Sequence, residues 1–355
     1  MPSRVTVPEG LDLGALIGAV QANCHLSDAH HAGDLTMCTF LLKMRELYRW
    51  EHDLGFASEL PKAAIGEWMA ARERLWERIE SDDYIPLPLP RGPLDPFAGT
   101  HINTALDAHD LVYSGGYGRG CKPHFFLARK HAEMQRDGMR ILVAGCEYAR
   151  DLDAPPGMLL DDTIFIRTEA LRRWLWERYE EWRWNQRNAA LGRALACYPF
   201  AEDVDVALDA MTACETESVI LHELGEAQAG AALGPAWHDL LAEVMKTRAE
   251  IMLRALRDLY ADSLSALPGL LARGGPAALH FYFANLVGMR RTLAPTLAAA
   301  YEHWLGTGDL EPLHQAAEAG RMTWRALLDE CLTLPARTPP DQLAAAVSAR
   351  LAPAS

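Results

Sequence analysis

The stretch Cys24–Asp34 concentrates side chains that bind metals or transfer protons. Its eleven residues hold three histidines, two aspartates and one cysteine. The apolar spacing around it predicts a helix with 3.6 residues per turn. Cys24, Asp28 and His31 then stand at positions i, i+4 and i+7, so they share one face of that helix.

A second face of this kind lies about two hundred residues later. In another predicted helix, Glu215, His222 and Glu226 stand at i, i+7 and i+11. Two helices that each present a carboxylate and an imidazole can close a metal site between them, and such ligands suit iron, manganese or zinc. We therefore predict one metal ion, iron or manganese rather than zinc. Its four ligands are Asp28, His31, His222 and Glu226.

The predicted function is a metal-dependent enzyme, an iron or manganese oxidoreductase or oxygenase that acts on a small molecule. His25 and His280 are further candidate ligands. Cys24, Glu215 and Glu217 complete the candidates for direct or supporting contacts with the metal. The competing hypothesis is a non-catalytic helical binding or scaffold protein, in which these clusters only satisfy helix ends and buried hydrogen bonds.

Two known metal motifs do not fit the chain. The Glu-x-x-His motif of di-metal helix bundles does not occur twice, because its single instance runs from Glu311 to His314. The segment 222–226, HELGE, lacks the second histidine of His-Glu-x-x-His, since position 226 is glutamate. We therefore exclude a zinc protease.

A third hypothesis, a thiol-dependent transferase or hydrolase, rests on Cys146. The apolar run 141–144 predicts a strand, and Cys146 then stands where a strand gives way to a helix. A helix N-terminus lowers the pKa of a thiol, and His124 or His131 is the candidate base. Arg150 is a further candidate catalytic residue, and Arg150 and Arg119 are the candidates to hold an anionic substrate. Tight strand–helix packing is the stronger explanation of the Gly-Cys pair.

A glycine-rich run at 114–120 can wrap a phosphate with backbone N–H groups. Arg119 is the candidate cofactor-binding residue in this run, with Lys122 beside it. The run has neither the Gly-Lys-Ser/Thr of a P-loop nor the context of a dinucleotide fingerprint. A hairpin turn explains it as well.

Helical periodicity dominates the elements that must position these residues. The predicted helices span 11–32, 35–51, 57–79, 169–186, 204–232, 236–264, 277–291, 295–304, 313–333 and 341–351. Segments 111–114, 141–144 and 163–167 predict strands, whereas 124–136 fits either state and is assigned to helix. Alternating prolines at 86–93 predict an extended strap.

This pattern predicts a mainly α protein, a multi-helix bundle with a small α+β insert near residues 110–167. Three parts are expected. The segment 1–82 supplies N-terminal helices, 83–167 holds the strap and the insert, and 168–355 is a helical region that packs with the N-terminal helices. No fixed-period repeat is apparent, which argues against a solenoid.

Charge and cysteine usage limit the classes of function and the partners. A net charge of −14 over 355 residues argues against non-specific binding to nucleic acid or an anionic membrane. The seven cysteines are odd in number and form no Cys-x-x-Cys, and no signal-like or membrane-length apolar run is present. We expect a cytoplasmic protein with a small-molecule substrate, and homo-oligomerisation stays open.

Three stretches resemble an uncharacterised bacterial protein family. They are Cys24-His25-Leu26-Ser27-Asp28-Ala29, the segment 41–51 and the segment 149–158. The resemblance covers most of the chain. It implies no activity, because no function is assigned to that family.

Overall fold

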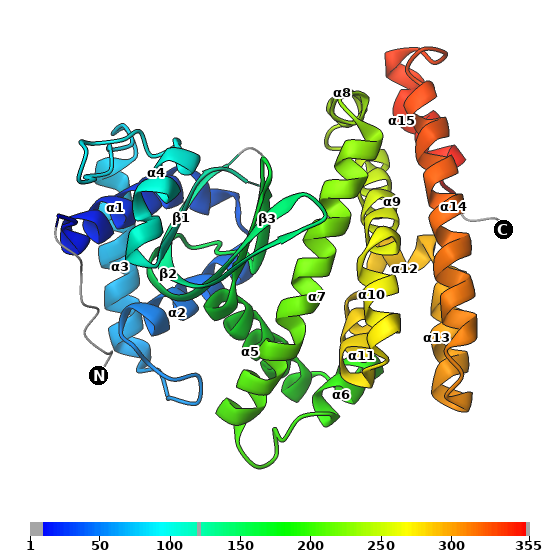
Figure 1. Cartoon of the computed structure of the whole chain (residues 1–355), viewed down its shortest axis with the longest axis horizontal. Helices are drawn as coiled ribbons and strands as arrows, with labels where there is room; N and C mark the ends of the chain where they lie inside the picture. The colour runs from blue at the N-terminus through cyan, green and yellow to red at the C-terminus, as the bar shows by residue number, and fades with distance from the viewer. Residues whose placement is uncertain (1–9, 119–121, 353–355) are drawn as a thin grey trace. The chain divides into compact units, whose positions relative to one another are not determined.

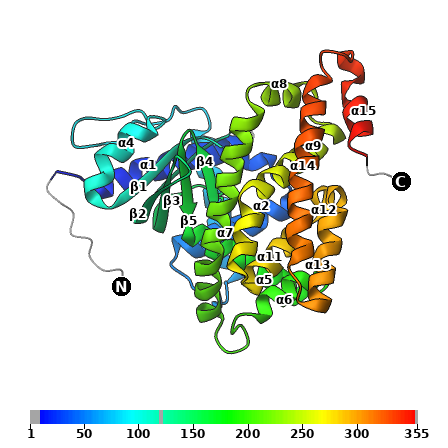
Figure 2. The same ribbon diagram turned by 45° about the vertical axis from the view of Figure 1, so that its right-hand side comes forward.

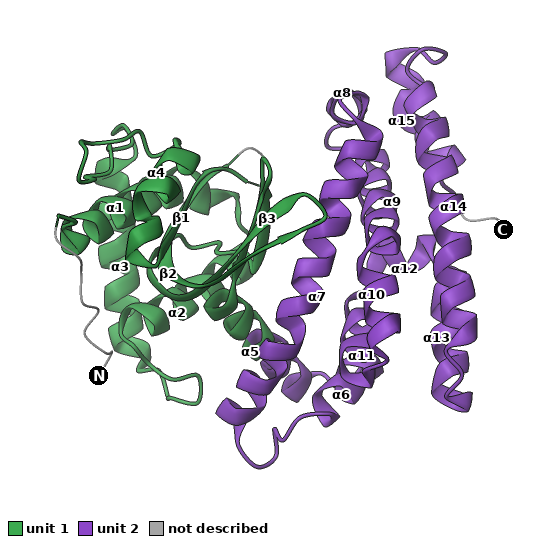
Figure 3. Ribbon diagram, in the orientation of Figure 1, with its two compact units in different colours: residues 1–176 green, residues 177–355 purple. Residues whose placement is uncertain are grey.

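The computed structural model of the chain describes residues 10–118 and 122–352. The chain divides into two compact units, residues 1–176 and 177–355, coloured green and purple in Figure 3. Helices predominate in both units, and one five-stranded sheet lies in unit 1 (Figure 1). The prediction of a mainly α protein is confirmed. No described helix is long and apolar enough to cross a membrane.

Unit 1 begins with three helices close to their predicted positions. They are α1 (Leu13–His31), α2 (Met37–Glu51) and α3 (Lys62–Ile79). Asp12 and Thr36 cap α1 and α2, because their side-chain oxygens accept hydrogen bonds from backbone N–H groups in the first turn. Helix α3 begins later than predicted, directly after Pro61, whose fixed φ suits the start of a helix.

The sheet contains β1 (Leu111–Tyr117), β2 (Pro123–Arg136), β3 (Met139–Arg150), β4 (Gly157–Leu160) and β5 (Thr163–Arg167). The strand order is β1-β2-β3-β5-β4, which Figure 2 shows from the side. All neighbours are antiparallel except β3 and β5, which are parallel. In the extended strap, Leu87 and Leu94 form an isolated antiparallel bridge.

The prediction of a helix at 124–136 is wrong, because this segment forms β2. The turn to β3 consists of Asp137 and Gly138, both with positive φ, and Asp-Gly is a strong two-residue hairpin signal. Phe125 and Leu127 pack with α1, whereas Phe126 joins the apolar cluster on the opposite face. That alternation has the period of a strand.

The sheet curls until its two edges approach each other. A Cβ on Gly116 of β1 would lie 3.2 Å from Cδ1 of Leu160 on β4. In a flat sheet, edge strands of five would lie roughly 19 Å apart, at about 4.8 Å per strand. The outer edge of β1 is also covered by α4 (Gly99–Leu106), where the Asn103 amide bonds both N and O of Tyr113, at 2.9 and 2.7 Å.

Helix α5 (Thr168–Trp184) starts in unit 1 and continues into unit 2. Unit 2 is helical throughout its described residues, and its helices share one large apolar core. They are α6 (Ala189–Ala196), α7 (Val204–Leu233), α8 (Ala236–Glu243), α9 (Arg248–Leu264), α10 (Ala266–Arg273), α11 (Pro276–Asn285), α12 (Gly288–Leu293), α13 (Pro295–Thr307), α14 (Glu311–Thr333) and α15 (Pro340–Arg350).

Two helices predicted as continuous in unit 2 are each divided. The segment 236–264 forms α8 and α9, because Lys246 takes a positive φ and Thr247 caps the start of α9. The segment 277–291 forms α11 and α12, with Gly288 at a positive φ at the break. Helical periodicity alone passed over both breaks, although Gly288 and the Thr247–Glu250 capping box are local signals for them.

Candidate functional site

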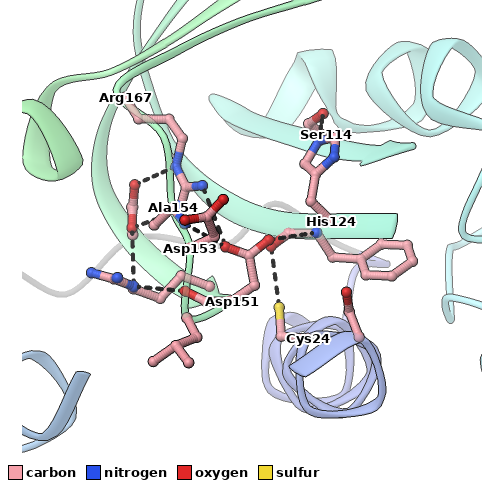
Figure 4. A network of polar contacts seen from close by, with 12 residues as sticks. Cys24, Ser114, His124, Asp151, Asp153, Ala154 and Arg167 are labelled. Atoms are coloured by element: carbon pink, nitrogen blue, oxygen red, sulfur yellow. Dashed lines mark hydrogen bonds and ion pairs between the residues drawn. The ribbon is translucent and has the colours of Figure 1, made fainter. Parts of the chain in front are cut away.

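A network of buried charged side chains lies where β3 ends in unit 1 (Figure 4). Arg167 of β5 donates two hydrogen bonds to the Glu147 carboxylate, at 2.7 and 2.9 Å, and both side chains are fully buried. The third guanidinium nitrogen of Arg167 lies 3.8 Å from the Asp151 carboxylate. Because such a pair is bidentate and desolvated, it fixes β3 against β5.

Asp28 and Cys24 join α1 to this network. Asp28 Oδ1 accepts a hydrogen bond from Leu152 N at 2.9 Å, and Cys24 Sγ donates to Phe125 O at 3.2 Å. Burial, and then the charge of Asp151, raise the pKa of Asp28 well above its usual value. A carboxyl that stays protonated is a poor metal ligand. In this arrangement Asp28 docks α1 onto the sheet.

The other predicted ligands of unit 1 also have protein partners. Arg72 lies 2.6 Å from His25 Nε2, and burial together with the Arg72 charge lowers the pKa of His25 to about 3. His31 Nδ1 lies 3.6 Å from an Asp34 carboxylate oxygen. His25 is therefore a neutral imidazole near neutral pH.

The predicted ligands of unit 2 are engaged as well. His222 Nδ1 lies 2.8 Å from Asp262 Oδ1, and Arg290 pairs with the other oxygen of Asp262. Glu226 pairs with Arg257 of α9. His280 Nδ1 lies 2.9 Å from the Tyr301 hydroxyl.

The four predicted metal ligands therefore fall into two pairs in separate units. Among residues 10–118 and 122–352, no group of three or more His, Cys, Asp or Glu side chains is arranged to hold a metal ion. Asp28 and His31 belong to unit 1, and His222 and Glu226 to unit 2. The metal site that would join them stays a prediction.

The His222–Asp262 pair predicts a pH-dependent stability of unit 2. Burial alone lowers the pKa of His222, but the hydrogen bond and charge of Asp262 outweigh it and raise the pKa to about 10. Because this folded-state value lies above the unfolded value of about 6.5, the stabilisation is complete below pH 6.5 and is lost towards pH 10. The difference in urea midpoint between the native chain and His222→Gln should be largest at pH 6 and vanish near pH 10. An equal difference at both pH values would contradict this.

The structure corrects the surroundings predicted for Cys146. Strand β3 continues through it to Arg150, so Cys146 does not stand at the start of a helix. Burial and the charge of Glu169 raise the pKa of the Cys146 thiol, which disfavours the reactive thiolate. Arg150 is buried, with its guanidinium 5.6 Å from the Trp50 ring centre. Arg119 lies outside the described residues.

Unit 1 contains a pocket of about 220 Å³ between the C-terminal half of α2, the loop after it and the first turns of α5. The residues that carry its chemistry are three arginines, three acids and two aromatic rings. They are Arg49, Arg172, Arg173, Glu46, Asp53, Glu169, Trp50 and Phe56. We name this the Glu169 pocket.

Local contacts hold the walls of the Glu169 pocket in place. Arg49 donates hydrogen bonds to the carbonyl oxygens of Gly55 and Ser58, at 2.5 and 3.3 Å, so it shapes the loop after α2. The Arg172 guanidinium lies 5.0 Å from the Phe56 ring centre. Phe56 also stacks on Trp176, with ring centres 5.6 Å apart. The loop is thereby fixed against α5.

Glu169 is the titratable group suited to proton transfer in this pocket. Its Oε2 accepts a hydrogen bond from Glu147 N at 2.7 Å, which links the pocket to the buried network. Burial, reinforced by the Glu147 charge, raises the pKa of Glu169 to about 7. A carboxyl that titrates near neutral pH can both donate and accept protons under physiological conditions.

A second cavity, of about 660 Å³, lies beside β1, the start of α4 and the turn between β4 and β5. Ser114 lines it, and its hydroxyl lies 3.2 Å from His124 Nε2, a pair labelled in Figure 4. Burial lowers the pKa of His124, so the imidazole is neutral. This polar pair was not predicted from the sequence. Ser114 and His124 stand ten positions apart in the chain, and only the pairing of β1 with β2 brings them together.

Family models match nearly the whole chain. Residues 15–167 match the N-terminal domain, and residues 172–354 the C-terminal domain, of a family described as a family of unknown function (DUF6866). The chain belongs to this family. No curated protein and no solved structure matches it.

The boundary between the two family domains falls at the start of α5. The Glu169 pocket combines residues 46–56 of the N-terminal domain with Arg172 and Arg173 at the beginning of the C-terminal domain. Glu169 lies between the two matched ranges. Its position in the first turn of α5 is typical of a helix-capping carboxylate, so the sequence carried no signal for a catalytic role.

Proposed function

We propose that unit 1 binds a small anionic molecule with an apolar or aromatic part in the Glu169 pocket, and that Glu169 exchanges a proton with it. The observation that carries this proposal is a carboxyl with a pKa of about 7 in a pocket lined by three arginines. Structural carboxylates on protein surfaces titrate well below neutral pH. Acid–base catalysis favours a value near neutrality.

The lining determines the class of ligand. Arginine pairs with carboxylate or phosphate oxygens through two parallel hydrogen bonds. Trp50 and Phe56 supply apolar surface beside those arginines. The volume of about 220 Å³ lies below the range of about 300–1,000 Å³ typical of larger ligands. An aromatic or short aliphatic carboxylate fits these features.

Charges around the pocket favour an anion when Glu169 is protonated. Glu46 is already paired, since its carboxylate oxygens lie 2.8 Å from Arg45 Nε and 3.4 Å from Arg49 Nε. Ionised Glu169 would add a negative charge beside the ligand. The protonated carboxyl removes that repulsion and offers a hydrogen-bond donor.

Benzoate is a probe of this proposal, with binding to the full chain measured by calorimetry at pH 6 and pH 8. Glu169 is about nine-tenths protonated at pH 6 and about one-tenth at pH 8, so affinity should fall roughly tenfold if only the protonated form binds. Glu169→Gln keeps an acceptor for Glu147 N and cannot ionise. Its affinity for benzoate should therefore be the same at both pH values.

Two arginine variants complete the test. Arg172→Gln should weaken benzoate binding at both pH values, because it removes a guanidinium from the lining. Arg74→Gln, an exposed residue of α3 outside the pocket, serves as the matched control and should bind like the native chain. Absence of binding, or a tenfold pH effect that survives in Glu169→Gln, would refute the proposal.

A further inference from the structure

A groove of about 380 Å³ in unit 1 is separate from the Glu169 pocket. It lies between the end of α1, the start of α2 and the C-terminal half of α3. Apolar side chains and small residues form most of its lining. They are Ala29, Ala32, Gly33, Leu35, Met37, Phe40 and Trp76.

The apolar surface extends along α2 beyond the groove. Met37 is 71% exposed and Leu41, one turn later, is 46% exposed. These positions, i and i+4, lie on one face of the helix. Phe40 packs edge-on against Trp76, with ring centres 6.5 Å apart, and so supports that wall from inside. An exposed apolar ridge beside a groove is typical of a protein-binding surface.

The opposite wall of the groove is acidic. Glu73 and Glu77 of α3 line it together with Glu80, the C-cap of that helix, and all three are exposed. None of their carboxylates forms an ion pair with another described residue. The three positions span roughly 10 Å along the helix axis, or two turns. The groove therefore offers three carboxylates that form no ion pair with another described residue.

Trp76 carries an unsatisfied hydrogen-bond donor. It lines the groove and is 6% exposed, yet its buried indole N–H has no hydrogen-bond acceptor among the described residues. A buried donor without an acceptor is costly, on the order of 1–3 kcal/mol.

We propose that this groove docks a short amphipathic helix of a partner protein, with apolar residues against Met37 and Phe40 and arginine or lysine along Glu73, Glu77 and Glu80. In helix-in-groove recognition the docked helix supplies apolar anchors at i, i+3 or i+4, and these would pack on the apolar side of the groove. An anionic membrane would be repelled by the acidic wall. In a two-fold contact between copies of this chain, each copy would present the same acidic wall to the other.

The test uses a labelled 18-residue leucine–lysine peptide designed as an amphipathic helix, with binding to the full chain followed by fluorescence anisotropy. Saturable binding is expected. The double variant Glu73→Lys/Glu77→Lys should weaken it at least tenfold, and Met37→Asp should weaken it as well. All three side chains are exposed, so these changes leave the fold intact.

Glu67→Lys is the matched control, because it makes the same charge change at an exposed position of α3 outside the groove. This variant and a scrambled peptide of the same composition separate docking from general attraction to an acidic protein. Equal weakening by Glu67→Lys, or equal binding of the scrambled peptide, would overturn the proposal. Self-association of the native chain that Met37→Asp abolishes, or binding to phosphatidylserine vesicles through Met37, would also overturn it.

Discussion

Replacing Arg167 with methionine should destabilise unit 1 by about 3–5 kcal/mol, which is the usual cost of removing one partner of a buried ion pair. Arg167 and Glu147 are both fully buried, and two hydrogen bonds join them. Methionine fills much of the same space but leaves the Glu147 carboxylate without its cation. The pair connects the parallel strands β3 and β5, so the effect should centre on the sheet.

Hydrogen exchange measured by mass spectrometry locates this effect in the full chain. Peptides from β3 and β5 should exchange roughly two to three orders of magnitude faster in Arg167→Met, since each 1.4 kcal/mol corresponds to a factor of ten. Arg140→Met is the matched control in the same sheet. Arg140 pairs with Glu133 at 2.7 Å in a partly exposed setting, where the loss should stay within about 1 kcal/mol. Equal effects of the two variants would contradict this account.

Substituting Gly225 with alanine should be the most damaging single-methyl change in unit 2. Helices α7 and α9 approach so closely at this point that a Cβ on Gly225 would overlap the Ala261 carbonyl oxygen and lie 2.8 Å from its carbon. No rotamer change relieves a clash with backbone, so the two helices must separate. Overpacking typically costs about 1–3 kcal/mol, occasionally more, and separation of α7 from α9 adds lost apolar contacts.

Gly230→Ala provides the control on the same helix. A Cβ at Gly230 would meet only the flexible end of Arg257, at 3.8 Å, which is ordinary contact. Alanine in a helix interior is favoured over glycine by about 1 kcal/mol. Urea unfolding should therefore show Gly225→Ala less stable, and Gly230→Ala slightly more stable, than the native chain. Similar stability of both variants would show that the backbones adjust without cost.

Most helices were predictable because helical periodicity is a local property. The first helix was predicted at 11–32 and lies at Leu13–His31, and the segment predicted at 204–232 lies at Val204–Leu233. The errors occurred where a local signal was overlooked or weak. Asp137-Gly138 marked a hairpin that would have assigned β2 correctly, and Thr247 followed three residues later by Glu250 marked the start of α9 as a capping box.

Candidate site residues were harder to predict, because their chemistry depends on neighbours distant in the chain. Asp28 has a raised pKa only because it is buried in the folded chain and lies near the charge of Asp151. Gly225 was only an unremarked position within the segment 222–226, yet its observed role is the close approach to Ala261. In the sequence, Glu169 is an ordinary carboxylate in the first turn of a helix. Its pocket exists only because the loop after α2 packs beside it in the folded chain.

The sequence by itself determined the mainly helical character, the acidic surface and most helix positions, because composition and short-range periodicity need no knowledge of partners. Only the tertiary structure decided which charged groups are removed from solvent and which side chains they pair with. Desolvation and pairing set the protonation of Glu169, His222 and Asp28, and both depend on contacts between segments far apart in the chain.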